Sequence, residues 1–227
     1  MKAIILSAGQ GSRLGHLVDD RPKCLIDFNG RSLLDRQLDT LDANGVGEAV
    51  VVTGFHDELV NEAIGRRSGG PSVRTIFNPF FKVADNTGSL YMAREELSGD
   101  CLVWNGDTLV SRSLMKRVLA NRQTGISVTI DRKPSYDDDD MKVVEEDRRL
   151  KAIGKRLPLE KQPKGYGNAA LWTARGKSQK PDFPPPPHRA WKARQKAADL
   201  STVPQPLRRF KYLDIRNKKQ QAPIREF

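Results

Sequence analysis

The first residues that could do chemistry lie in a glycine-rich loop near the N-terminus. Glycines stand at positions 9, 11 and 15, directly after the apolar run of residues 2–7. Because glycine has no side chain, backbone N–H groups there can approach phosphate oxygens closely. Arg13 adds a planar guanidinium and Lys23 a compact ammonium, and both groups bind phosphates. The pattern predicts a site for a phosphorylated ligand.

Two better-known phosphate loops do not fit this segment. The dinucleotide fingerprint G-x-G-x-x-G needs its third glycine where the sequence has Leu14, and Arg13 interrupts it. A Walker A loop needs Gly-Lys-Ser/Thr after its glycines, and that run is missing. An ordinary glycine turn is the simpler interpretation. Three glycines together with Arg13 and the run Arg21-Pro22-Lys23 favour a binding loop.

A carboxylate follows a second apolar run. Residues 101–104 are apolar, and Asn105, Gly106 and Asp107 come next. A carboxylate at a strand end can hold Mg²⁺, which prefers oxygen ligands. The alternative is a common Asn-Gly-Asp turn. In parallel sheets ligands bind at the carboxyl ends of the strands, so we expect Asp107 and the glycine loop to face one site.

Alternating strands and helices are predicted to position these residues. Apolar runs predict strands at 2–7, 48–53, 73–77, 101–104, 126–131, 141–145 and 149–153, and helical spacing predicts helices at 31–44, 56–66, 88–97 and 112–121. This alternation predicts an α/β fold of three layers around a mostly parallel sheet, in one domain of residues 1–160.

Residues 161–227 have a different composition. They hold nine of the 14 prolines and sixteen Lys and Arg residues against four acids, so they carry the whole net charge of +11. Such a composition predicts a divergent, basic, Pro-rich and poorly ordered tail, apart from a short strand near 210–213. A nucleic-acid or anionic-membrane arm is the functional alternative for this tail. The near-neutral body predicts no nucleic-acid partner.

The numbers of cysteines and histidines indicate the cellular compartment. Two cysteines and three histidines are too few for a disulfide framework or a zinc cluster, which fits a reducing cytoplasm. No apolar stretch approaches the roughly 18–20 residues that a membrane-spanning helix needs.

The segment from Leu6 to Leu25 resembles the signature of the sugar-phosphate nucleotidyltransferases and MobA-like NTP transferase domains. That signature is typically L-A-G-G-x-G-x-R-L, then P-K. The matching residues are Gly9, Gly11, Arg13, Pro22 and Lys23, whereas Ser7 and Gln10 replace the usual Ala and Gly.

The resemblance implies a nucleotide-diphospho-sugar transferase-like fold (GT-A/Rossmann-like) and an Mg²⁺-dependent reaction. NMP would pass from an NTP to a small phosphorylated acceptor, with release of pyrophosphate. Arg13 would bind the β- and γ-phosphates, Lys23 would lie between the α-phosphate and the acceptor phosphate, and Asp107 would hold the metal. The implied nucleotide-binding residues are Ser7, Ala8, Gly9, Gly11 and Ser12.

Three further segments resemble a subgroup that acts on phosphocholine and similar phospho-alcohols, which favours CTP as donor. They begin at Asn86, at Asp140-Met141-Lys142-Val143 and at Gly154. The resemblance implies nucleotide contacts from Asn86 and Gly88, and acceptor contacts from Asp140, Lys142 and Lys155. The acids at 137–140 are alternatively a solvated loop. The aromatic residues Tyr91, Trp104 and Tyr136 are candidates for boxing a quaternary ammonium, or pack in the core or at its rim.

The resemblance covers about residues 1–160 and then stops. Related enzymes have a second metal aspartate there, in a segment like W-x-E-I-D. In the nearest segment Arg216 takes that position and Asp214 stands two residues early. Either Asp214 substitutes or the second ligand is absent. An absent second ligand favours the alternative of a catalytically impaired nucleotide-binding or regulatory protein of the same fold. A GT-A glycosyltransferase is another alternative, but such enzymes usually have an Asp-x-Asp metal motif, whereas Asn105-Gly106-Asp107 has one acid. The sequence leaves the oligomeric state open.

Overall fold

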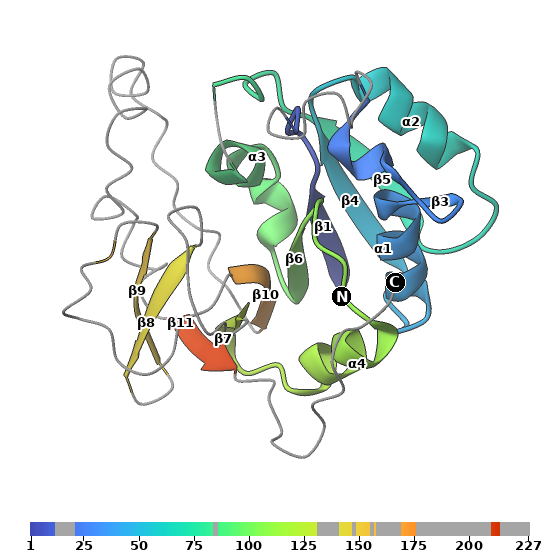
Figure 1. Cartoon of the computed structure of the whole chain (residues 1–227). Coiled ribbons are helices and arrows are strands. Elements are labelled where there is room, and N and C mark those ends of the chain that lie inside the picture. Colours follow the sequence, from blue (N-terminus) through green and yellow to red (C-terminus); the bar gives the residue numbers. More distant parts are fainter. Residues whose placement is uncertain are drawn as a thin grey trace.

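A nine-stranded sheet forms the centre of the molecule in the computed structural model (Figure 1). The structure describes residues 1–11, 21–83, 86–130, 141–146, 149–154, 157, 169–175 and 210–213. The strand order is β5-β4-β1-β6-β10-β7-β11-β9-β8. The strands are β1 (Lys2–Leu6), β4 (Glu48–Thr53), β5 (Ser72–Phe77), β6 (Cys101–Asn105), β7 (Gly125–Ile130), β8 (Lys142–Glu146), β9 (Arg149–Gly154), β10 (Ala169–Arg175) and β11 (Phe210–Leu213). A separate hairpin pairs β2 (Asp27–Phe28) with β3 (Arg31–Ser32).

Four neighbouring strands, β5, β4, β1 and β6, run parallel. Strands β1, β4 and β6 are almost continuously buried apolar runs, which is typical of parallel strands covered on both faces. Their parallel direction brings the residues after Leu6, Thr53 and Asn105 to one edge of the sheet. The expected meeting of the strand ends is confirmed.

Helices cover both faces of this half of the sheet, as predicted. Helices α1 (Leu33–Asp42), α2 (Asp57–Gly65) and α4 (Arg112–Ala120) pack on one face, where they bury Leu38, Val60 and Met115. Helix α3 (Asn86–Met92) and the 3-10 helix Arg94–Leu97 cover the other face, which includes Ile4 and Val103 (Figure 1). The three layers of the α/β fold are therefore present.

Local signals explain where two of these helices begin. The Ser32 hydroxyl accepts a hydrogen bond from the Asp35 N–H at 3.0 Å, and the Ser111 hydroxyl accepts one from the Leu114 N–H at 3.1 Å. Each serine satisfies one of the N–H groups that a helix start leaves without a partner. The Ser32 cap fixes the start of α1, which lies beneath the candidate site.

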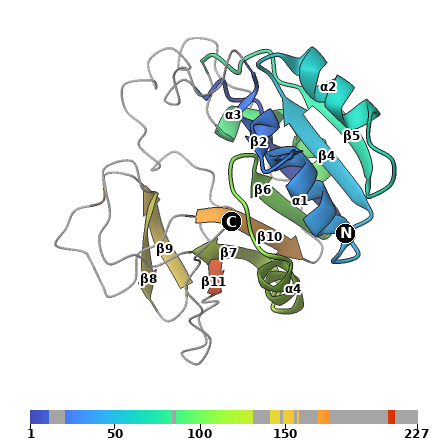
Figure 2. The same ribbon diagram turned by 45° about the vertical axis from the view of Figure 1, so that its right-hand side comes forward.

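The segment after residue 160 contributes to the sheet, which differs from the prediction of a tail with little part in the core. Strand β10 lies between β6 and β7 and runs antiparallel to both (Figure 2). Strand β11 pairs with β7 and β9, at the place where a short strand is expected. Composition missed β10 because sheet pairing, which is set by distant neighbours, decides its conformation. The order of the remaining residues after 160 stays a prediction.

Candidate active site

The loop after β1 lies between the loops that follow β4 and β6. The Ser7 N–H donates to the Val52 carbonyl at 2.8 Å, and the Ala8 carbonyl accepts from the Phe55 N–H at 3.1 Å. On the other side, the Gly106 N–H donates to the Leu6 carbonyl at 2.9 Å. These bonds fix the first part of the glycine loop against both neighbouring strand ends.

Two glycines outside the glycine loop permit this close packing. A Cβ on Gly106 would lie 2.2 Å from Ser7 Oγ and 2.8 Å from the Leu6 carbonyl oxygen. A Cβ on Gly54 would lie 2.7 Å from the Ala8 carbonyl oxygen. The sequence pattern indicates Gly106 only as part of a turn and does not single out Gly54. Their position at strand ends next to the loop was the available signal.

Gly9 and Gly11 have different structural roles within the glycine loop. Gly9 is exposed, and a Cβ at this position would meet no atom within 4 Å. Gly11 has a φ of 70°, a left-handed conformation that glycine adopts without strain. Gly9 thus presents open backbone, while Gly11 turns the chain. Both observations agree with a loop that receives a ligand.

Lys23 and Asp107, predicted as catalytic residues, lie together at this edge. Lys23 begins the 3-10 helix Lys23–Leu25, and Asp107 follows β6. The Lys23 Nζ atom is 2.7 Å from Asp107 Oδ2, although 84 residues separate them in the chain. The two side chains are 35% and 46% exposed, and an ion pair so exposed contributes only about 0–1 kcal/mol to stability. The pair is accessible to a ligand, and its stabilising effect is small.

Asn86 joins the same edge from the other face of the sheet. Its Nδ2 atom donates to Asn105 Oδ1 at 3.2 Å, two residues before Asp107. Gly88 is buried in the same helix. The next residue, Ser89, accepts a hydrogen bond from the buried Asn78 at 3.2 Å. Ser7, Ala8 and Gly9, on the loop after β1, and Asn86, at the start of α3, therefore lie at the same edge as the Lys23–Asp107 pair. Gly88 lies two residues further along α3.

The other predicted site residues have different outcomes. Ser12, Arg13, Asp140, Lys155 and Asp214 lie outside the described residues. Lys142 is the first residue of β8, and four strands lie between β8 and β6. Its acceptor role stays a prediction. Trp104 is fully buried in the cluster with α1 and α4, so the hypothesis that it boxes an acceptor is wrong.

A buried thiol belongs to the residue after Lys23. Cys24 is 2% exposed, and burial raises the pKa of its thiol to about 11, although the Ser7 hydroxyl beside it lowers that pKa in part. A thiol with such a pKa is almost entirely protonated at neutral pH and is a poor nucleophile. Cys24 is therefore a packing residue, as its lack of a neighbouring histidine in the sequence indicates.

The described part of the site fits a metal that arrives with the nucleotide. Among the described residues, no group of three His, Cys, Asp or Glu side chains is arranged to hold a metal ion. Mg²⁺ commonly takes one or two protein carboxylates and completes its shell with phosphates and water. Asp107 alone therefore suits a metal held jointly with a triphosphate.

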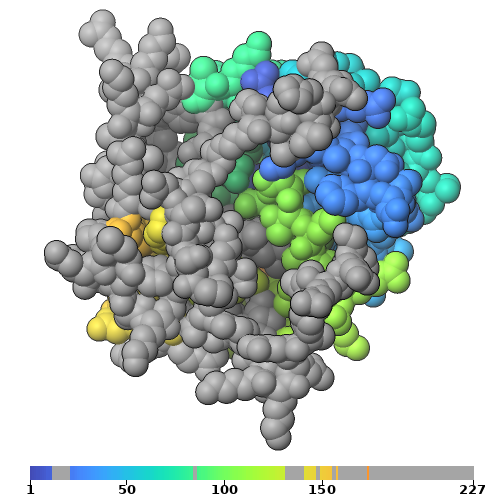
Figure 3. All heavy atoms as spheres, viewed as in Figure 1, coloured from blue at the N-terminus to red at the C-terminus, as the bar shows by residue number. Residues whose placement is uncertain are grey.

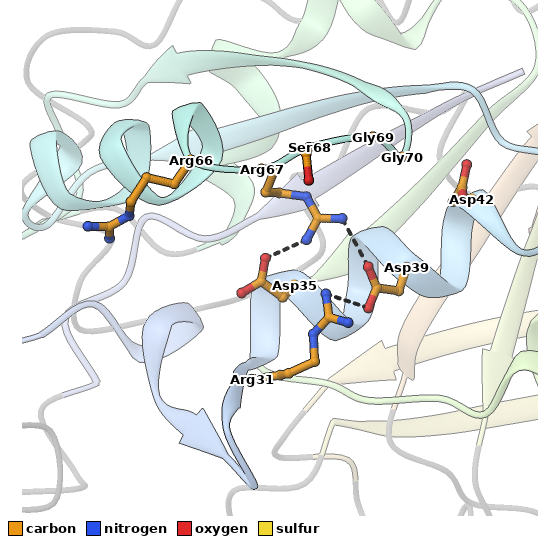
Figure 4. Close-up of a pocket in the computed structure, with 9 residues that line it drawn as sticks. All are labelled: Arg31, Asp35, Asp39, Asp42, Arg66, Arg67, Ser68, Gly69 and Gly70. Carbon is orange, nitrogen blue, oxygen red and sulfur yellow. Dashed lines mark hydrogen bonds and ion pairs between the residues drawn. The ribbon is translucent and has the colours of Figure 1, made fainter.

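A hollow of about 420 Å³ lies on the outer face of α1 and is lined by paired charges (Figure 4). Arg67 donates to both Asp35 and Asp39, and Arg31 pairs with Asp39 at 2.8 Å. Burial would raise the pKa of Asp35, but hydrogen bonds from Ser32 and Arg67 outweigh it and hold this pKa below its ordinary value. These contacts join the segment after α2 to α1.

Family membership follows from a match along most of the chain. Residues 3–174 match the model of the MobA-like NTP transferase domain. The chain belongs to this family. The match extends beyond residue 160 and includes nearly all of β10, in agreement with the place of β10 in the sheet.

Individual relatives are nucleotidyltransferases. The chain is 35% identical over 120 residues to the CMP-5'-(3-aminopropyl)phosphonate synthase of Streptomyces rubellomurinus, covering 53% of this chain and 19% of that protein. It is 30% identical over 128 residues to the choline-phosphate cytidylyltransferase of Streptococcus pneumoniae, covering 56% and 53%. The matches thus span about a fifth and about half of these relatives.

A solved structure shows the same fold. The inositol-1-phosphate CTP transferase from T. maritima superposes with a TM-score of 0.65 and 22% identity, covering 77% of this chain and 70% of the other. The nucleotidyltransferase-type, GT-A-like fold is therefore confirmed. Among the described residues, no helix has the length and apolarity needed to cross a bilayer.

Proposed function

We propose that this protein transfers NMP from an NTP to a small phosphorylated acceptor and releases pyrophosphate. The observation that carries the proposal is the accessible Lys23–Asp107 pair, 2.7 Å apart, at the strand ends beside an open glycine loop. A cation for phosphate and a carboxylate for Mg²⁺ are the two charges that phosphoryl transfer requires.

The chemistry is an in-line displacement. An acceptor phosphate oxygen attacks the α-phosphorus, a new P–O bond forms, and the bond to the β-phosphate oxygen breaks with pyrophosphate as leaving group. When bound, Mg²⁺ would neutralise charge on the phosphates. Lys23 exchanges its partner Asp107 for phosphate oxygens and stabilises the charge that builds up during transfer. The glycine loop, with Arg13, holds the nucleotide in line with the acceptor.

CTP and a phosphocholine-like acceptor are the substrates we favour, with a sugar 1-phosphate as the second acceptor class. The support is the names of two relatives, a CMP-phosphonate synthase and a choline-phosphate cytidylyltransferase, together with the segments around Asn86 and Lys142.

Both cysteines of the chain are free and buried, which supports function in a reducing cytoplasm.

The test is release of pyrophosphate from each of CTP, UTP, GTP and dTTP, with Mg²⁺ and a panel of phospho-alcohols and sugar 1-phosphates. We expect Lys23→Ala to lower kcat/KM at least about 100-fold, because a charge on the transferring group acts most in the transition state. Asp107→Asn should abolish metal-dependent turnover. Lys116→Ala, at an exposed lysine of α4, is the matched control and should keep wild-type activity.

Three outcomes would contradict the proposal in different ways. NTP binding without pyrophosphate release under any condition would favour a regulatory nucleotide-binding protein. Transfer of sugar from a nucleotide-sugar would favour the glycosyltransferase. Normal turnover of Lys23→Ala would place the phosphate-binding charge elsewhere.

A further inference from the structure

A polar side chain is buried beneath the loop that carries Asp107. Gln37 lies on the core face of α1 and is completely buried. Its Nε2 atom donates to the Asn105 carbonyl at 2.9 Å and to the Thr108 carbonyl at 2.8 Å. A buried NH₂ group without acceptors would be costly, so these two bonds favour the orientation in which Nε2 faces the turn.

The two accepting carbonyls belong to Asn105 and Thr108, which lie on either side of Asp107 in the chain. A carboxamide NH₂ has two hydrogens, and both carbonyl acceptors face it, so Gln37 bridges the two ends of the segment 105–108. The Thr108 N–H also donates to the Asn105 carbonyl at 3.2 Å, which closes a turn. Asp107 itself is 46% exposed, so its position depends mainly on how this backbone turn is held.

Helix α1 also supports the partner of Asp107. Cys24 and Leu25, which follow Lys23 in the 3-10 helix, pack in the same cluster as Leu38 of α1. On its outer face α1 is held by Arg67, which donates to Asp35 and Asp39 (Figure 4). The region of α1 (blue) and the segment after β6 (light green) adjoin on the surface in Figure 3. One fixed helix therefore supports both charged residues.

We propose that Gln37 is a positioning residue that holds the turn of Asp107 in register with Lys23 and the metal. This inference rests on the proposed function, because it assigns to Asp107 the carboxylate that binds Mg²⁺. Partners that orient a metal ligand commonly change metal affinity or activity 10–100-fold when they are mutated. Gln37 reaches the turn from 68 residues away in sequence, so no local motif indicates it.

The test compares Gln37→Met with Asn44→Leu. Methionine matches the length of glutamine but donates no hydrogen bond. Asn44 is the matched control, since its Nδ2 atom also donates to two carbonyls, those of Thr40 at 2.8 Å and Arg112 at 3.3 Å, away from the turn. Leucine matches the shape of asparagine in the same way. Both variants lose two hydrogen bonds, but only Gln37→Met loses the bonds to the turn of residues 105–108.

Two measurements are made on both variants. In the metal-free protein, hydrogen exchange of the Gly106 and Thr108 amides should be at least tenfold faster in Gln37→Met than in wild type, and unchanged in Asn44→Leu. In turnover assays the Mg²⁺ concentration for half-maximal rate should rise about 10–100-fold in Gln37→Met alone. Equal exchange and equal Mg²⁺ dependence in the two variants would overturn the positioning role.

A third measurement needs no variant, in case Gln37→Met does not fold. In the wild-type protein, NMR should show both side-chain amide hydrogens of Gln37 protected from exchange, and their resonances should shift when Mg²⁺ and CTP are added. Free exchange of these hydrogens would overturn the inference. A wild-type protein with protected Gln37 hydrogens and no turnover would instead contradict the proposed function and leave the structural bridge standing.

Discussion

The close contact between the loops after β1 and β6 makes Gly106→Ala a direct test of the site geometry. The added Cβ would lie 2.2 Å from Ser7 Oγ, 2.8 Å from the Leu6 carbonyl oxygen and 3.0 Å from Ser7 Cα. The Ser7 hydroxyl can rotate away, but the other two atoms belong to the backbone. We therefore expect the two loops to move apart by several tenths of an ångström.

The size of the effect follows from these contacts. Overpacking a closely packed site costs about 1–3 kcal/mol, which for a domain of this size lowers Tm by roughly 2–4 °C per kcal/mol. The displaced loop carries Asp107, so turnover should fall as well. A shift of 1 Å in a group that positions substrate can reduce the rate about 100-fold.

Urea unfolding and pyrophosphate release measure both effects. Gly47→Ala is the matched control, because a Cβ there meets no atom within 4 Å and Gly47 lies before β4, away from the site. The double variant Ser7→Ala/Gly106→Ala removes only the contact with the hydroxyl, so it should recover part of the lost stability. If Gly106→Ala unfolds at the same urea concentration as Gly47→Ala, the described packing of the two loops is wrong.

Two further predictions test the ligand loop and the charges of the sheet. Gly9→Ala should leave the free energy of unfolding unchanged, because its Cβ meets open space, and should weaken CTP binding in calorimetry; wild-type affinity would show that the nucleotide does not approach Gly9. The pKa of Glu96 is lowered to about 2, by hydrogen bonds from Arg74 and then Lys2 that outweigh burial. The shift corresponds to at most about 3–4 kcal/mol, reduced by solvent screening to about 1–2 kcal/mol. Because this pKa is lowered, the stabilisation is present above about pH 4.5 and is lost as the pH falls toward 2. The stability difference between wild type and Glu96→Gln in urea should therefore be largest at pH 7 and shrink below pH 4.5, and a constant difference would refute the assignment.

Much of the parallel part of the sheet, formed by β5, β4, β1 and β6, could be predicted from sequence because its signals are local. The buried runs of β1, β4 and β6 are continuous, and the Ser32 cap with Leu34, Leu38 and Leu41 indicates α1. The meeting of the glycine loop after β1 with the loop that carries Asp107 also followed, since parallel strands end at one edge of a sheet. Local pattern and a general topological rule were sufficient for these features.

Features that depend on distant partners could not be predicted in this way. Gln37 is a polar residue on an apolar helix face, and only the carbonyls of Asn105 and Thr108 explain its burial. The segment 169–175 reads Ala-Ala-Leu-Trp-Thr-Ala-Arg and shows no clear alternation, within a basic, Pro-rich region. Its strand conformation comes from pairing with β6 and β7. In both cases contacts with residues distant in sequence determine the structure, which composition alone does not indicate.

The antiparallel strand β10 determines how the two halves of the sheet are connected. It pairs Trp172 with Val103 of β6 and with Val128 of β7, so it is the strand that joins the four parallel strands to β7, β11, β9 and β8. Without it, β6 would have an unpaired edge next to the strand end that carries Asp107. Lys142 on β8, which is expected to bind the acceptor, belongs to the half beyond this strand. The proposed transfer from nucleotide to acceptor thus depends on a strand from the segment whose composition alone indicates a tail.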